Sequence, residues 1–127
     1  MTIQECYEML GGNYDEVIGR FKKETLVERF ARKFPDDQSF SQLTNALEKG
    51  ETELAFRAAH SLKGVCLNLS FTKLHNSTHE ITELLRKGKI TEAKEYFPTV
   101  KSDYGSTVSA IRLFEKNIEA RLLPVWR

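Results

Sequence analysis

Apolar residues recur every three or four positions along most of this chain, which is the spacing of one face of an α-helix. No segment alternates apolar and polar residues for long enough to predict a β-strand. Helices are expected over residues 2–10, 13–33, 36–50, 52–69, 70–88, 91–97 and 98–120. The loops between the long segments are short, so successive long helices should be antiparallel neighbours. We therefore expect an all-α fold, an up-down antiparallel four-helix bundle with short additional helices.

Capping and helix-breaking residues set these expected limits. Asn13 follows two glycines and is placed as the N-cap of the second helix, which Pro35 then ends. Ser70 is placed as the N-cap of the helix over residues 70–88. Pro98 is expected in the first turn of the last long helix, where proline is tolerated because its missing N–H has no partner there.

Length and charge limit the class of protein. The 127 residues fit one domain, which we place at residues 1–120, followed by a tail at 121–127. The 19 basic and 18 acidic residues leave a net charge of +1, which favours neither a nucleic acid nor a membrane as partner. No apolar run approaches the roughly 18 residues of a membrane span. The N-terminus has an early acid and no basic segment, so we expect no secretory signal and a cytoplasmic protein.

The segment 52–69 carries the functional information. Its apolar stripe, which predicts the core face, consists of Leu54, Ala55, Ala58, Leu62, Val65, Cys66 and Leu69. At about 100° per residue, His60 lies nearly opposite the middle of that stripe. We therefore expect His60 to face solvent or the flank of a neighbouring helix. Cys66, and with less support Cys6, is interpreted as a small buried hydrophobic residue.

The residues that share the face of His60 are unusual for a helix surface. Phe56 and Leu67 are large and apolar, and Gly64 costs about 1 kcal/mol relative to alanine inside a helix. A glycine retained at this cost suggests that something approaches the helix closely here. Phe56 and Leu67, with Arg57 beside them, are predicted to contact a partner protein.

The chemistry of this face fits phosphoryl transfer. A neutral imidazole is a nucleophile near neutral pH without a separate activating base. Lys63, one turn from His60, can offer a cation to the oxygens of a phosphoryl group on the ring. Gly64 would leave the approach to the ring unobstructed.

The stretch Ala59-His60-Ser61-Leu62-Lys63-Gly64 resembles the A-H-x-L-K-G signature of histidine-containing phosphotransfer (HPt) domains. The resemblance covers roughly residues 10–118 and implies a four-helix bundle that carries a phosphoryl group on His60. It implies exchange with an aspartate of a response-regulator receiver domain, or with a hybrid sensor histidine kinase, as part of a phosphorelay. The receiver would supply Mg²⁺, so no cofactor or metal is expected here. The chain would be a phosphocarrier and not an enzyme.

Two positions depart from the commonest family pattern. Thr82 stands where many members have a Gln or Glu that bonds the other ring nitrogen of the histidine, and His79 coincides with a histidine found in the chemotaxis-kinase type. Either residue is a candidate for orienting His60. Ser70 stands where glycine is common between the two helices, which affects the turn more than the chemistry.

Other interpretations are weaker. A helical adaptor that binds a partner through Phe56 and Leu67, without phosphoryl transfer, is the main alternative. A histidine kinase is disfavoured because no ATP-binding domain fits in the bundle. His75 and His79 have the spacing of a metal-binding pair, but the sequence presents no third ligand. We expect a monomer.

Overall fold

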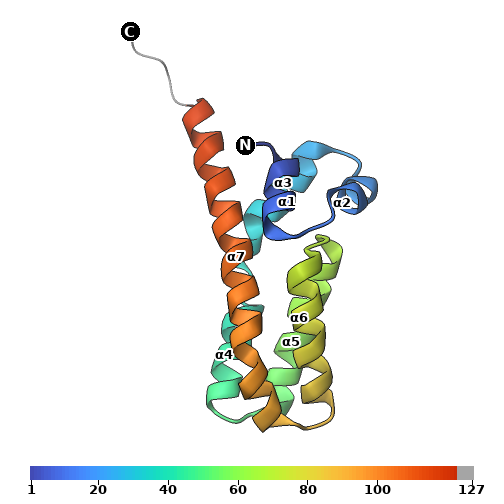
Figure 1. The fold of residues 1–127 in the computed structure, drawn as a ribbon, viewed down its shortest axis with the longest axis vertical. Helices are drawn as coiled ribbons and strands as arrows, with labels where there is room; N and C mark the ends of the chain where they lie inside the picture. The colour runs from blue at the N-terminus through green and yellow to red at the C-terminus, as the bar shows by residue number, and fades with distance from the viewer. Residues whose placement is uncertain (123–127) are drawn as a thin grey trace.

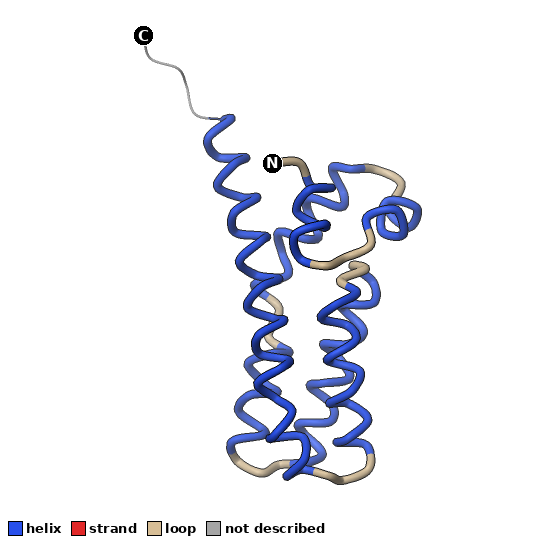
Figure 2. Tube along the Cα trace, in the orientation of Figure 1, coloured by secondary structure: helices blue, strands red, loops and turns tan. Residues whose placement is uncertain are grey.

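A computed structural model describes residues 1–122 and shows helices joined by short loops (Figures 1 and 2). In chain order the elements are α1 (Ile3–Leu10), α2 (Tyr14–Phe21), α3 (Glu24–Lys33), the 3₁₀ turn η1 (Phe34–Asp36), α4 (Ser39–Glu48), α5 (Thr52–Asn68), α6 (Thr72–Arg86) and α7 (Ile90–Leu122). Within this part of the chain Figure 2 shows no strand. The predicted all-α class is confirmed. The part of the predicted tail at 123–127 lies outside the described residues.

The helices α4, α5, α6 and α7 form an antiparallel bundle, in which α5 packs between α4 and α6, and α6 packs on α7 (Figure 1). The shorter helices α1, α2 and α3 gather at the end of the bundle where α5 ends and α6 begins. They are joined to it by α1 and α3, which pack on α7. The predicted four-helix bundle with short additional helices is therefore confirmed.

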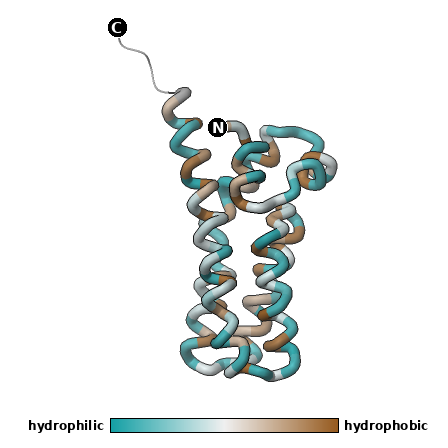
Figure 3. Tube along the Cα trace, in the orientation of Figure 1, coloured by the Kyte–Doolittle hydropathy of each residue, from teal (hydrophilic) through white to brown (hydrophobic). Residues whose placement is uncertain are grey.

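Hydrophobic residues are interspersed with hydrophilic ones along the helices (Figure 3). Because the hydrophobic residues recur at helical spacing, each helix has one face to bury. The bundle interior is formed by fully buried side chains that include Leu43, Leu62, Leu74, Ile81 and Ile111. At the other end, the fully buried rings of Tyr7, Phe71 and Phe114 join the short helices to the same core. No helix within residues 1–122 is long and apolar enough to cross a membrane.

The single helix predicted over residues 13–33 is wrong, because the chain breaks into α2 and α3. Lys22 adopts a left-handed conformation with φ of 70°, and its N–H bonds back to the carbonyl of Ile18 to close α2. The break folds α3 back beside α2, so that Phe21 stacks on Phe30 at 5.0 Å between ring centroids. Local periodicity cannot predict this contact, because the contact brings together two rings that one straight helix would keep apart.

The predicted boundary at Pro98 is also wrong, because α7 is one helix that continues through it. A proline inside a helix removes a hydrogen bond and typically costs about 3 kcal/mol or more. Packing on both sides of the proline offsets that cost: Phe40 of α4 stacks on Phe97 and on Tyr104, at centroid distances of 5.6 and 3.9 Å. The aromatic contacts hold the two halves of α7 against the same neighbour.

Ser70 is not the helix N-cap that we predicted. It lies in the turn between α5 and α6 with φ of 56°, a region that residues other than glycine rarely adopt. Its hydroxyl donates to the carboxylate of Glu16 at 2.6 Å and accepts from the guanidinium of Arg20 at 3.0 Å. Its carbonyl accepts from the N–H of Asn13 at 2.9 Å. The left-handed conformation explains why the position suits glycine, and these contacts offset its cost here.

Candidate functional site

The core face of α5 is built largely from small side chains. Ala55, Ala58, Ala59, Leu62 and Cys66 are buried, and the alanines let α4 and α6 approach closely. Two members of the predicted stripe lie outside the core: Leu54 is 51% exposed and Val65 is half-buried. Leu54 is exposed because it lines an open groove between α4 and α5 and not the bundle interior.

The opposite face of α5 presents His60 to solvent, as the periodicity predicts. Gly64 and Leu67 are also exposed, with Leu67 at 55%, and Phe56 and Lys63 are half-buried. The structure therefore brings these five residues, which we call the outer face of α5, onto one accessible side of the helix. Leu67 and the half-buried Phe56 give this side of the helix apolar area beside His60.

The ring of Phe56 links His60 to the next helix. It stacks on the imidazole of His60, with 5.9 Å between centroids and 25° between planes. The guanidinium of Arg86, from α6, lies 5.0 Å from the centroid of the same ring. Arg86 in turn bonds to the carboxylate of Glu83 at 3.1 Å. Sequence reasoning missed Arg86 and Glu83, because only the packing of α6 on α5 brings them to Phe56.

Lys63 lies near Glu83 but forms no salt bridge with it. The pKa of Glu83 is held below its ordinary value, first by the hydrogen bond from Arg86 and then by the charges of Arg86, His79 and Lys63. Lys63 makes no salt bridge with any residue within positions 1–122. Its ammonium is therefore available for another anion.

Gly64 lies in open space. A Cβ added to it would meet no atom of the described residues within 4 Å, so packing in this part of the chain does not require a glycine there. Gly12 is the opposite case, because a Cβ there would lie 2.7 Å from the ring of Tyr7 and 2.9 Å from the carbonyl oxygen of Ser70. The helix-interior glycine of the outer face therefore has no packing reason within the described structure.

Neither candidate for orienting His60 is brought into hydrogen-bond contact with it. Thr82 is fully buried, and its hydroxyl donates to the carbonyl of Thr78 at 2.6 Å, as threonines inside helices commonly do. His79 is exposed, and its ring lies beside that of His75 at 6.3 Å between centroids. Whether either residue acts on His60 when a partner is bound stays a prediction.

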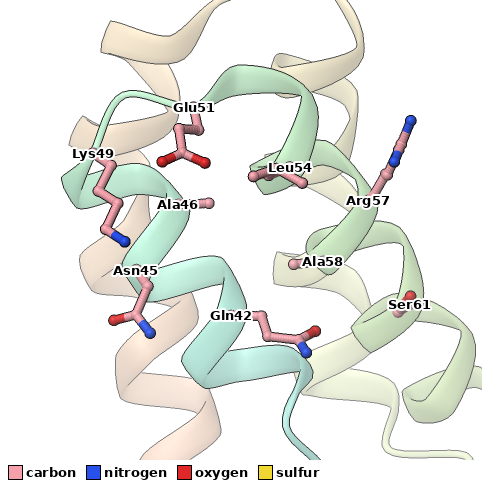
Figure 4. A pocket seen from close by; sticks show the side chains of 9 residues that line it. All are labelled: Gln42, Asn45, Ala46, Lys49, Glu51, Leu54, Arg57, Ala58 and Ser61. Carbon is pink, nitrogen blue, oxygen red and sulfur yellow. The ribbon is translucent and has the colours of Figure 1, made fainter.

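A groove of about 400 Å³ runs between α4 and α5 on the flank of the outer face (Figure 4). Its lining residues are Gln42, Asn45, Ala46, Lys49, Glu51, Leu54, Arg57, Ala58 and Ser61. Arg57, predicted to contact a partner, points away from α4 in Figure 4 and forms a salt bridge with Glu53 at 2.6 Å. The groove thus combines amide groups, charges of both signs and the exposed Leu54.

Within residues 1–122 this face presents neither a metal-binding cluster nor an exposed thiol. Within residues 1–122, no three His, Cys, Asp or Glu side chains are grouped closely enough to hold a metal ion. Cys6 and Cys66 are buried and free, as predicted. Burial raises the pKa of Cys6 to about 11 and that of Cys66 further, so both thiols are neutral at physiological pH.

Comparison with known families identifies the class of protein. The family model of the Hpt domain matches residues 25–114, a span that includes most of α3, all of α4 to α6, most of α7 and the motif at 59–64. The chain belongs to the Hpt domain family. It is thus a phosphotransfer domain of phosphorelay signalling, a phosphocarrier. No curated protein and no solved structure matches the chain.

Proposed function

We propose that His60 is the residue that carries the phosphoryl group, and that the chain relays it to or from an aspartate of a receiver domain. The observation that supports this most is the exposure of His60 on the outer face of α5, beside Lys63 and a glycine with open space where a Cβ would lie. The position lies inside the segment that matches the Hpt family.

The transfer needs little from the protein beyond a nucleophile, a cation and access. A ring nitrogen of neutral His60 attacks the phosphorus of an aspartyl phosphate. The P–N bond forms as the P–O bond to aspartate breaks, and the aspartate leaves as a carboxylate. The reverse attack by the carboxylate returns the group to a receiver. Mg²⁺ held by the receiver would neutralise charge on the moving phosphoryl group.

Lys63 and Gly64 have separate roles in this proposal. The ammonium of Lys63 stabilises the phosphoryl oxygens on His60 by a charge-assisted hydrogen bond. Because it is a point charge on a flexible stem, Lys63 can follow the group as it arrives and leaves. Gly64 keeps the surface beside the ring flat, so that the rim of the receiver's active site can come close enough for in-line attack.

The receiver, or the receiver domain of a hybrid sensor histidine kinase, would dock over the outer face of α5 and its flank. Leu67 and Leu54 offer exposed apolar area on the two sides of His60. The groove between α4 and α5 adds hydrogen-bonding groups and depth to one of those sides. Exposed apolar area mixed with hydrogen-bonding groups in this way is typical of transient protein interfaces.

We also propose that the phosphotransfer domain spans residues 1–120, beyond the matched segment at 25–114. The first helix is bound to the last one: the thiol of Cys6 lies 3.5 Å from the carbonyl oxygen of Ala110, and the N-terminal amine donates to Asn117 at 3.2 Å. Ile3, Tyr7 and Val17 contribute fully buried side chains to the common core.

The test is to incubate the protein with a phosphorylated receiver and to assay for acid-labile, base-stable phosphate. We expect label on the wild type and none on His60→Gln. His75→Gln is the matched control that should keep the label, and circular dichroism should show all variants folded. An unlabelled wild type that still binds receivers would favour the adaptor alternative, and equal labelling of His60→Gln would refute the assignment of His60.

A further inference from the structure

The side chain of Phe56 has contacts in the structure that a simple docking residue does not need. It is half-buried, stacks on His60 within its own helix and lies under the guanidinium of Arg86 from α6. Residues four apart on a helix are neighbours, so the stack follows from the positions 56 and 60. The contact with Arg86 comes from tertiary packing alone.

His60 has no polar group in the described structure that fixes its ring. Thr82, on the facing helix, is engaged with the carbonyl of Thr78. His79 makes no hydrogen bond to His60 within residues 1–122. The stack on the aromatic face of Phe56 is a contact that can limit the rotation of the imidazole.

We propose that Phe56, held in place by Arg86, is a positioning residue that sets the orientation of the His60 ring for phosphoryl transfer. The inference rests on the proposed role of His60 and extends it. Aromatic rings prefer offset stacks of this kind, and a guanidinium over a phenyl face is attracted by the ring quadrupole. The two contacts together restrict both rings.

Arg86 is needed because packing alone leaves Phe56 room to move. A hollow of about 380 Å³ opens beside the phenyl ring, lined by Thr52, Glu53, Leu85, Arg86 and Gly88. Arg86 covers the ring from this side, and its salt bridge to Glu83 fixes the guanidinium in turn. Glu83, Arg86, Phe56 and His60 therefore form one connected series from α6 to the reacting nitrogen.

The first test measures the His60 ring directly by NMR. The ring current of Phe56 should shift the His60 ring protons upfield in the wild type, and Phe56→Leu should remove that shift. Phe56→Tyr, which keeps the ring, should retain it. Arg86→Gln should reduce it, whereas Lys87→Gln, the loss of an adjacent exposed cation, should not. Identical His60 signals in the wild type and in Phe56→Leu would overturn the proposal.

The second test separates positioning from docking by single-turnover transfer from a phosphorylated receiver. Phe56→Leu should lower the rate constant at saturating receiver about tenfold, with little change in the half-saturating concentration. Leu67→Ala, a docking control on the same face, should raise the half-saturating concentration and leave the rate constant nearly unchanged. A Phe56→Leu variant that changes only the half-saturating concentration would show that Phe56 merely docks the partner.

The two proposals fail in different ways. A wild type that takes no label refutes the phosphocarrier role of His60, and with it any role of Phe56 in transfer. A labelled wild type with an unchanged rate in Phe56→Leu refutes only the positioning role.

Discussion

The outer face of α5 and the turn that follows α5 both contain a residue that disfavours its own backbone conformation. In the turn, Ser70 adopts φ of 56°, which costs about 1–2 kcal/mol for a residue with a Cβ. On the outer face, Gly64 lies inside a helix, which costs about 1 kcal/mol relative to alanine. The two costs are similar, but the surroundings of the two residues differ.

The turn offsets its cost within the molecule, through the bonds of Ser70 to Glu16, Arg20 and Asn13. No contact on the outer face offsets the cost of Gly64, since no atom of the described residues lies within 4 Å of the position that its Cβ would take. A local cost that the fold balances is structural. A local cost that the fold leaves unbalanced indicates a contact with a partner outside the chain. The same criterion separates two glycines. Gly12 packs against Tyr7 and Ser70 and is structural, whereas Gly64 has open surroundings and is a candidate functional residue.

The largest expected effect comes from a substitution that perturbs the turn, the structural region of this comparison. Gly12→Ala should lower the free energy of unfolding by about 2–3 kcal/mol, because overpacking a rigid site forces its neighbours apart. The new Cβ would meet the carbonyl oxygen of Ser70 at 2.9 Å and the buried ring of Tyr7 at 2.7 Å. Urea denaturation followed by circular dichroism measures this. A loss below that of an ordinary surface substitution would contradict the structural role.

The next effect tests the functional side. Gly64→Gln should slow phosphoryl transfer about tenfold, because the new side chain obstructs the approach to His60. The fold should persist, since the side chain enters open space. Transfer assays measure the rate, and thermal melts on the same samples measure whether the fold persists. A melting temperature that falls in proportion to the rate would mean that Gly64 is structural after all.

A smaller effect has the opposite sign from the first. Gly64→Ala should raise the free energy of unfolding by about 0.5–1 kcal/mol, because alanine favours the helix and meets no neighbour. Gly105→Ala is the matched control, since Gly105 is exposed inside α7 with equally open surroundings. Both variants should gain stability, and only Gly64→Ala should affect transfer. Slower transfer in both would remove the distinction.

The smallest effect concerns how the turn depends on pH. The hydrogen bond from Ser70, followed by the charge of Arg20, holds the pKa of Glu16 below its ordinary value of 4.5. A lowered pKa in the folded state adds stability above the unfolded pKa, and this stability is lost as the pH falls through the folded value. Glu16→Gln should therefore be less stable at neutral pH and should lose less stability between pH 5 and 2.

Denaturation midpoints across that range measure the effect, with Asp15→Asn as the control from the same helical turn. A wild type and a Glu16→Gln variant with parallel pH profiles would show that the contact with Ser70 contributes nothing to the turn.

Much of the site was predictable from local pattern. The limits of α5 and the exposure of His60 follow from a period of 3.6 residues, which the sequence displays directly. The break at Lys22 and the continuity of α7 through Pro98 were not predictable in this way. In both places the fold adds an aromatic contact that local pattern does not predict, in the stacks of Phe21 on Phe30 and of Phe40 on Phe97.

The sequence by itself therefore determined an all-helical chain, the helix that carries His60, and the side of that helix on which His60, Lys63 and Gly64 lie. These are properties of residues within a few turns of one another, where backbone geometry fixes the neighbours. Only the tertiary structure decided that Thr82 lies in a fully buried position, and that Arg86 contacts the ring beside His60. Those contacts depend on how α6 is rotated against α5, which is set by the packing of the whole core.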